Sequence, residues 1–327
     1  MKNITKLKSQ STQVLLDAAR EKGIKTEVIS KRFNLLKLTF NGDSLFIKGT
    51  SFHVNSQPAC LIASNKLLTK RILRMHKIDI PKSWLVKTPK EAREMIIKKN
   101  LFPCVLKPIR GAHGNRVFAN IQSLKEFDEV LPLVFNKPGE KNVLIEEHIK
   151  GKNYRLLVVG NKVSAVMERI PAHVIGDGTG SIRQLIKKFN QNPLVGEKYE
   201  KPLCKIIING EVKRNLKKQK IKLTYIPKKK EKIFLRQNAN ISTGGIGKDV
   251  TDKISDKMKK VAIQATKAIG IAISGVDIIH EKSSEKFYVL ELNHCPGIDI
   301  HHYPAIGKPR KVADDIIEFL VRNKVGK

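Results

Sequence analysis

Three oxygen-bearing side chains near the C-terminal end of the chain are candidate ligands for a divalent cation. Glu291 and Asn293 lie two positions apart in an apolar run, so a strand would project both from one face. Asp277 lies in a preceding apolar run that could pair beside it. Buried carboxylates need a neutralising partner, and hard oxygen ligands suit Mg²⁺ that also contacts phosphates. The alternative is a solvated face of an edge strand.

A lysine followed by a glycine-bearing turn indicates a phosphate site. Lys107 ends a short apolar strand, Pro108 stops it, and the turn over residues 110–116 contains Gly111 and Gly114. A lysine meets phosphate as a point charge, and backbone amides of such a turn can cradle it. The alternative is an ordinary surface lysine. Neither a P-loop nor a GxGxxG motif occurs, so those two kinds of nucleotide site are not supported.

Two further segments have features of a binding site, and each has a plain structural alternative. The run over residues 143–151 is a strand that could present backbone groups to an adenine edge, or a core strand with a charged end. The run over residues 236–245 is rich in amide and hydroxyl donors and ends in two glycines. It could wrap an anion, or it could be a plain turn.

Helices and strands that alternate along the chain must position these residues. The pattern predicts helices over 11–22, 65–76, 91–99, 124–131, 182–190, 257–269 and 312–320. It predicts strands over 26–29, 35–40, 44–47, 104–107, 117–119, 143–146, 154–159, 162–168, 274–280 and 287–293. Residues 213–232 are interpreted as a polar, exposed segment. This alternation favours an α+β or α/β fold over a helical bundle.

Composition limits the classes of protein to consider. The chain has 327 residues, of which 41% are hydrophobic, enough for two or three subdomains. No run approaches the roughly 20 apolar residues of a membrane span, and no signal peptide is recognisable. The four cysteines are scattered without a CxxC pair, which suits a reducing compartment. We therefore expect a cytoplasmic protein with no membrane partner.

The formal net charge of +33 has three possible explanations. It could serve a nucleic acid, it could serve an anionic substrate such as ATP or an acidic peptide, or it could reflect a lysine-rich composition. Aromatic residues make up only 6% and do not alternate with basic ones. This pattern favours lysine bias over nucleic acid and leaves nucleic acid open.

An ordered set of motifs resembles the ATP-grasp superfamily. It consists of Lys107-Pro108, Glu146-Glu147, Asp277 and Glu291-Leu292-Asn293. The sequence resembles the ATP-grasp domain of cyanophycin synthetase and, nearly as well, that of fused bacterial glutathione synthetase. The similarity covers residues 60–322 and includes the segments 169–178, 234–245, 249–252, 293–297 and 307–310.

The resemblance implies an α+β ATP-grasp fold, with two α/β subdomains that grip ATP. Residues 1–62 are then a small α/β lead-in, a reduced form of the region that precedes ATP-grasp domains. Residues 63–150 are the N-terminal subdomain with the phosphate loop. Residues 151–327 are the C-terminal subdomain with the metal and substrate sites. A homo-oligomer, dimeric or tetrameric, is also implied.

The resemblance also assigns roles to single residues. Those implied to bind ATP are Lys66, Lys107, Gly111, His113, Gly114, Glu146, Glu147, Ile149 and Asn153, of which Asn153 stands where many relatives have an acidic residue. Those implied to hold Mg²⁺, or Mn²⁺ in its place, are Asp277, Glu291 and Asn293. Those implied to act on the reacting groups are Arg169, Arg236 and Asn240. Those implied to bind substrate are His173, Ser242, Thr243, Gly244, Gly245, His301 and Arg310.

Three departures from the family pattern matter. Arg116 stands where the phosphate loop has a third glycine, and Asp299 stands where cyanophycin synthetase has a basic residue. The chain shows neither the Mur-ligase-like domain nor the glutamate–cysteine ligase domain of these two enzymes. We therefore expect it not to be a complete version of either.

The expected activity is an ADP-forming carboxylate–amine ligase that works through an acyl phosphate. Its substrate would be an amino acid or a peptide, and the positive charge makes an acidic one attractive. Two alternatives remain. One is an ATP-grasp phosphotransferase, and the other is a retired catalytic fold that binds nucleotide or nucleic acid.

Overall fold

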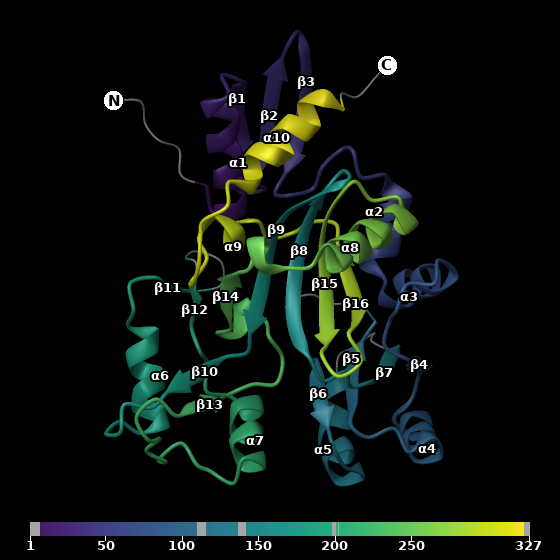
Figure 1. Ribbon diagram of the computed structural model, residues 1–327, viewed down its shortest axis with the longest axis vertical. Coiled ribbons are helices and arrows are strands. Elements are labelled where there is room, and N and C mark those ends of the chain that lie inside the picture. The colour runs from purple at the N-terminus through teal and green to yellow at the C-terminus, as the bar shows by residue number, and fades with distance from the viewer. Residues whose placement is uncertain (1–6, 110–115, 137–141, 198–200, 202, 324–327) are drawn as a thin grey trace.

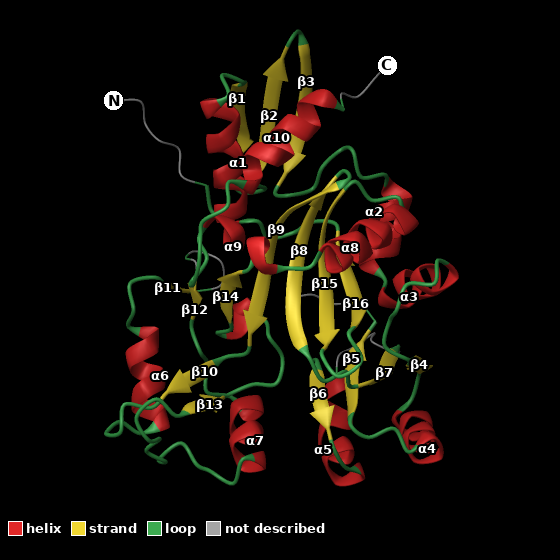
Figure 2. Ribbon diagram, in the orientation of Figure 1, coloured by secondary structure: helices red, strands yellow, loops and turns green. Residues whose placement is uncertain are grey.

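The structure is a computed structural model, and it describes residues 7–109, 116–136, 142–197, 201 and 203–323. Figure 1 shows one small unit of helix and strands at the top, a long sheet in the middle and two lobes below. Figure 2 shows that helices and strands group into separate layers. The fold is α+β, as predicted.

The middle of the molecule is a five-stranded sheet with the order β14-β9-β8-β15-β16, in which all neighbours are antiparallel. Its strands are β8 (Lys152–Val159), β9 (Lys162–Ile170), β14 (Ile246–Asp249), β15 (Ile273–Glu281) and β16 (Lys286–Asn293). The two runs that carry the candidate metal ligands do pair, with Asp277 opposite Glu291. The predicted pairing of these strands is confirmed.

One face of this sheet is apolar along its length and is covered by helices. Leu156, Val158, Val276 and Ile278 are buried there in one hydrophobic cluster. The covering helices are α8 (Asp256–Ile269), α2 (Gln57–Ser64) and α3 (Lys66–Met75). In Figure 1, α8 overlies the upper part of β15 and β16, and α2 and α3 lie to its right. Side chains alternate along a strand, so the residues between these face the opposite side.

The opposite face of the sheet has two parts, one that packs against other elements and one that lines a cleft. Its upper half, with Leu157 and Val159, packs against the lead-in and the last helix. These elements are α1 (Gln10–Glu21), β1 (Lys25–Ser30), β2 (Leu35–Phe40), β3 (Asp43–Lys48) and α10 (Val312–Arg322). Helices α1 and α10, the first and last of the described chain, thus lie side by side at the top of Figure 1. The lower half of this face carries polar side chains and remains open to a cleft.

A four-stranded sheet, ordered β4-β7-β5-β6, forms the lower right lobe of Figure 1. Its elements are β4 (Ser83–Val86), α4 (Pro89–Lys99), β5 (Cys104–Pro108), β6 (Phe118–Ile121), α5 (Leu124–Phe135) and β7 (Val143–Glu147). Thr88 and Ser123 cap the two helices, each accepting from the backbone NH three residues on. Helix α5 runs four residues beyond its predicted end, with Pro132 inside it.

The other lobe has a small core of its own. Its elements are β10 (His173–Ile175), α6 (Ile182–Asn190), β11 (Val195–Gly196), β12 (Leu203–Cys204), α7 (Gly210–Lys218) and β13 (Lys232–Phe234). The prediction that residues 213–232 are all polar and exposed is wrong. Val212 and Leu216, one turn apart, are buried in this core, so the segment begins in an amphipathic helix.

The remaining elements are short. They are α9 (Asp299–His302) and two 3₁₀ turns, Ile241–Thr243 and Thr251–Lys253. In the part of the chain that the structure describes, no helix is both long and apolar enough to cross a bilayer.

Asn55 joins the loop after the lead-in to the central sheet. Its Oδ1 accepts from the backbone NH groups of Ala272 and Ile273, both at 3.0 Å. Its Nδ2 donates to the carbonyl of Ile273 at 2.9 Å. The side chain is buried, so it satisfies backbone groups that water does not reach.

We predict that Asn55→Ala lowers the free energy of unfolding by about 3 kcal/mol, because buried backbone groups lose their partners. Urea unfolding measures the change. The exposed Ser44→Ala in the lead-in is the matched control and should shift stability by less than about 0.5 kcal/mol. Equal stability of the two variants would contradict the prediction.

Candidate active site

A cleft of about 970 Å³ opens between the five-stranded sheet, the four-stranded sheet and the lobe that contains β10–β13, α6 and α7. We call this lobe the β13 lobe. Lys66 of α3, Lys107 of β5 and Glu146 of β7 form part of its wall. Asp277 of β15 and Glu291 of β16 lie on the same wall. Residues that the sequence spreads over more than two hundred positions therefore meet around one space.

A second cavity of about 950 Å³ adjoins the cleft. Four residues line both spaces, and these are Lys66, Arg169, Asn240 and Glu291. The rest of its wall comes mainly from the lead-in, from the end of β16 and from the segment that follows it, with further residues from α2, β8 and the 3₁₀ turn at Ile241–Thr243. We call it the adjoining cavity. Two substrates bound in the two spaces would meet at the four shared residues.

Glu146, on the wall of the cleft, binds two lysines, of which Lys107 also lines the cleft. Its Oε2 lies 2.8 Å from Nζ of Lys107, and its Oε1 lies 3.2 Å from Nζ of Lys70. Burial alone would raise the pKa of the Glu146 carboxyl, but the two ammonium groups outweigh it and lower the pKa. Glu146 is therefore a carboxylate at neutral pH, despite being 2% exposed.

Asp277 is held between two arginines by the register of the sheet. Arg155 stands opposite it on β8, and Nη2 of Arg169, from β9, lies 2.6 Å from its Oδ2. Arg155 bonds both carboxylate oxygens. Burial acts to raise the pKa of Asp277, but the guanidinium groups prevail and lower it to about 2.

Asp277, Glu291 and Asn293 are the predicted ligands of a divalent cation. Glu291 lies opposite Asp277, and its Oε2 is 3.6 Å from Nζ of Lys66. Among the described residues, no three His, Cys, Asp or Glu side chains form a metal cluster by themselves. Two carboxylates and one amide suit Mg²⁺ that takes further ligands from phosphates. Both Asp277 oxygens now bond arginines, so one arginine would have to release an oxygen before that oxygen could bind the cation.

Arg236 lines the cleft, and a residue of the neighbouring lobe holds its side chain in place. It is 5% exposed, and its Nη1 bonds Glu211 at the start of α7. Burial raises the pKa of the Glu211 carboxyl, and Arg236 acts to lower it. The helix that the sequence analysis missed therefore orients a candidate catalytic arginine.

The structure brings most of the predicted site residues together. Those that line the cleft are Lys66, Lys107, Glu146, Glu147, Ile149, Asn153, Arg169, Arg236, Asn240, Asp277 and Glu291. Ser242 and Asn293 line the adjoining cavity. Gly111, His113 and Gly114 lie outside the described residues.

Three of the predicted substrate-binding residues line neither space, and these are His173, His301 and Arg310. Nδ1 of His173 lies 2.8 Å from the carbonyl of Pro171, with which it shares a hydrogen bond. Arg310 binds the carboxylates of Asp249 and Asp252, with Nη2 at 2.8 and 2.6 Å. His301 is fully buried, and burial lowers its pKa to about 3, so it is a neutral core residue.

At the end of the segment 236–245, close packing against neighbouring residues sets the backbone conformation. Thr243, Gly244 and Gly245 also lie off the walls of both spaces. A Cβ on Gly244 would come within 2.4 Å of Ile206, and its φ of +92° is in the region that favours glycine. Gly244 lets the loop pass close to Ile206 of the neighbouring lobe.

Arg116 shows how the departure in the phosphate loop is accommodated. Its φ is +56°, the left-handed conformation that glycine adopts most easily. Its Nη1 donates to the carbonyl of Val134 in α5 at 3.1 Å. The side chain is therefore directed to α5.

Two charged residues of the site were missed in the sequence. Arg155 lies two positions after Asn153 on β8, so strand alternation places both on the cleft face. Lys70 lies one helical turn after Lys66 on α3. Each could have been found from a neighbour on the same face.

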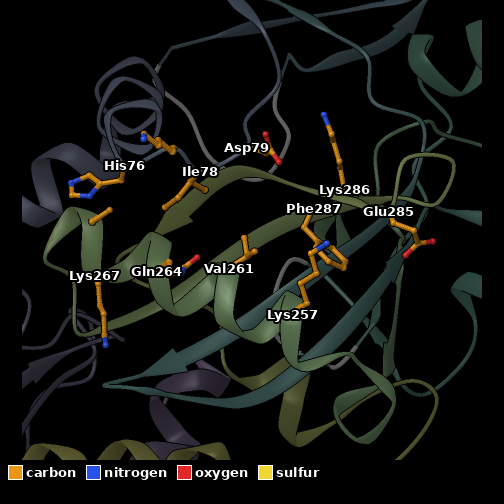
Figure 3. A pocket seen from close by; sticks show the side chains of 12 residues that line it. His76, Ile78, Asp79, Lys257, Val261, Gln264, Lys267, Glu285, Lys286 and Phe287 are labelled. Atoms are coloured by element: carbon orange, nitrogen blue, oxygen red, sulfur yellow. The ribbon is translucent and has the colours of Figure 1, made fainter.

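A separate pocket of about 540 Å³ lies away from these residues, between the end of α3, α8 and the β15–β16 turn. Figure 3 shows its lining, with Lys257, Lys267 and Lys286 around Val261 and Phe287. It shares no lining residue with the cleft or the adjoining cavity.

Comparison with known proteins gives a consistent family. The sequence model of the RimK-like ATP-grasp domain matches residues 63–177 and 225–317. A glutathione biosynthesis bifunctional protein from Clostridium perfringens is 36% identical over 318 residues, which are 95% of this chain and 41% of that protein. A cyanophycin synthetase from Geminocystis herdmanii is 31% identical over 95% of this chain and 36% of its own length.

A solved structure agrees with these matches. The crystal structure of a bifunctional glutathione synthetase from Pasteurella multocida has a TM-score of 0.68 and 30% identity. The match covers 95% of this chain and 43% of that one. The chain thus spans less than half the length of these relatives.

The ion pairs of Asp277 predict a dependence of stability on pH. Since its pKa falls from 3.8 to about 2 on folding, the pairs stabilise the protein fully above pH 4 and lose this effect as the pH falls toward 2. The loss should amount to about 2 kcal/mol.

Urea unfolding of the wild type and of Asp277→Asn between about pH 5 and pH 2.5 measures this effect. The variant should lose less stability over that interval, while exposed Asp79→Asn should follow the wild type. Identical pH dependence in wild type and Asp277→Asn would refute the assignment.

Proposed function

Since the chain belongs to the RimK-like ATP-grasp family, we propose that it is an ATP-dependent ligase that forms a carbon–nitrogen bond and releases ADP. The observation that carries this proposal is the pair of spaces that meet at Lys66, Arg169, Asn240 and Glu291. A phosphotransferase needs the nucleotide and one acceptor, whereas a ligase must also bring in an amine.

The cleft is the proposed ATP site. Lys66 and Lys107 contact phosphates as point charges. Glu146, Glu147 and Ile149 lie at the end of β7 and just beyond it, where a strand end can meet the adenine edge, and Asn153 lies near the ribose. Gly111, His113 and Gly114 complete the phosphate loop in this proposal.

Asp277, Glu291 and Asn293 are the proposed holders of Mg²⁺, with Mn²⁺ as a substitute. When bound, the cation supplies positive charge at the phosphates that react. Lys66 already lies against Glu291 and could keep its carboxylate in place. Arg155 and Arg169 keep the Asp277 carboxylate ionised.

The adjoining cavity is the proposed site of the carboxylate and amine substrates. Lys8 and Lys48 of the lead-in line it, as do Arg155 and Arg169, so it suits an amino acid or a short, acidic peptide. Ser242 lies on its wall. The relatives named for glutathione biosynthesis and cyanophycin synthesis support a substrate of this size.

The side chains at the shared wall, together with Arg236 of the cleft, have distinct tasks in the reaction. A free carboxylate resists an amine because its leaving group is oxide, and phosphorylation turns it into an acyl phosphate. Arg169 and Arg236 orient the carboxylate and stabilise the charge of the transferring phosphoryl group. Asn240 can donate to the tetrahedral intermediate as the amine adds and phosphate leaves. The surrounding loops exclude water that would hydrolyse the acyl phosphate.

The proposal extends to the organisation of the chain. Residues 1–62 form the lead-in, 63–150 the N-terminal subdomain and 151–327 the C-terminal subdomain. A cytoplasmic location, a homo-oligomeric state and the lack of a membrane partner remain predictions. Nucleic acid remains an alternative partner for the positive charge.

The first test is ADP release from Mg·ATP across a panel of amino acids and short peptides, singly and in pairs. We expect release that needs both a carboxylate and an amine, with a product lighter than the two substrates by one water in mass spectrometry. A phosphorylated final product would replace the ligase with a phosphotransferase. ATP binding without release for any pair would favour a retired site.

The metal assignment has a separate test. Glu291→Gln should lower turnover by about 10²-fold or more, because the charge that holds the cation is lost. Glu27→Gln on the exposed face of β1 is the matched control and should keep wild-type turnover. Full activity of Glu291→Gln would remove Glu291 from the metal site.

A further inference from the structure

Lys70 is joined to the cleft through Glu146 without reaching its surface. It is 1% exposed and is not among the residues that line the cleft. Its Nζ lies 3.2 Å from Oε1 of Glu146 and 3.5 Å from the carbonyl of Pro81. The other oxygen of Glu146 faces Lys107 at 2.8 Å. One carboxylate thus bridges two ammonium groups, one hidden and one at the cleft.

The net charge of the cluster formed by Lys70, Glu146 and Lys107 depends on Lys70. Two lysines and one glutamate leave a net charge of one, and Lys107 is the member that lies both beside the carboxylate and on the cleft wall. Without Lys70, Glu146 and Lys107 would form a neutral pair. A neutral pair attracts phosphate much less than a net positive cluster does, above all where burial weakens screening.

We propose that Lys70 is a positioning residue for the nucleotide. It holds one oxygen of Glu146 and supplies the second positive charge, which leaves Lys107 a net attraction for phosphates. The inference rests on the proposed function only in that the cleft binds a nucleotide. It does not depend on which carboxylate or amine reacts.

The surroundings of Lys70 make its charge sensitive to pH. The charged groups that act on it are Glu146 of β7, Lys107 of β5 and Arg74 on its own helix. Burial is the main cause that lowers the pKa of Lys70 to about 8. The positive charges of Lys107 and Arg74 also lower this pKa, and the carboxylate of Glu146 acts to raise it. Lys70 is therefore charged at neutral pH, and it loses its proton as the pH rises through about 8.

The first test is ADP binding by calorimetry at neutral pH. Lys70→Met should weaken the affinity for ADP by about tenfold, which is the order of one charge–charge interaction at an intermediate dielectric. Lys70→Arg should retain most of the affinity, because the charge is kept. Lys98→Met, which removes an exposed lysine of α4, is the matched control and should bind as wild type does.

A charge cycle separates this role from simple packing. In Glu146→Gln the cluster keeps both lysines without the carboxylate, so a further Lys70→Met should cost less affinity than it does in the wild type. Inorganic tripolyphosphate serves as a second ligand, since it reports the phosphate attraction without the adenine contact. Equal cost of Lys70→Met in both backgrounds would contradict the proposal.

The pH profile of the wild type decides the matter if Lys70→Met does not fold. ADP affinity should fall between about pH 7 and pH 9 as Lys70 deprotonates, and in Lys70→Arg the fall should be absent. A flat profile in the wild type, or unchanged ADP binding by folded Lys70→Met, would overturn the role of Lys70. Failure of the wild type to bind ADP at all would instead overturn the proposed nucleotide site.

Discussion

A buried charge must have a partner, and this constraint shapes the centre of the molecule. Asp277 and Glu146 are each 2% exposed, and each carboxylate lies between two cationic side chains. Removal of one cation would leave a charge in a low dielectric, which is costly. The strands must therefore keep the register that places Arg155 opposite Asp277. On its other side β15 pairs with β16, and that register places Glu291 opposite Asp277.

The central sheet performs two tasks because its side chains alternate. One face supports the fold along its whole length, through α8 and its neighbours. The other face packs under the lead-in at one end and carries the charged groups at the other. The lead-in is thus part of the site, since it completes the wall of the adjoining cavity. Both ends of the chain contribute to the core that holds it in place.

The sequence predicted the parts of the site that lie in continuous motifs. Glu291 and Asn293 share a strand, and Lys107 stands at the end of one, so local spacing was sufficient to find them. Arg155 and Lys70 are isolated in the sequence and were missed, although each lies on the same face as a predicted residue. His301 and Arg310 look like ligands in the sequence. In the structure His301 is fully buried, and Arg310 binds two aspartates, so neither lies on the wall of the two spaces.

The sequence by itself determined the fold class, the family and most of the strands and helices, because these depend on local periodicity and on ordered motifs. Helix α7 escaped because its lysines outnumber the two apolar residues that it buries. Only the tertiary structure decided which charges neutralise one another, since ion pairs such as Lys70 with Glu146 join residues far apart in the chain. It also decided where two cavities share a wall. No local pattern encodes such contacts, because they arise only when separate sheets pack together.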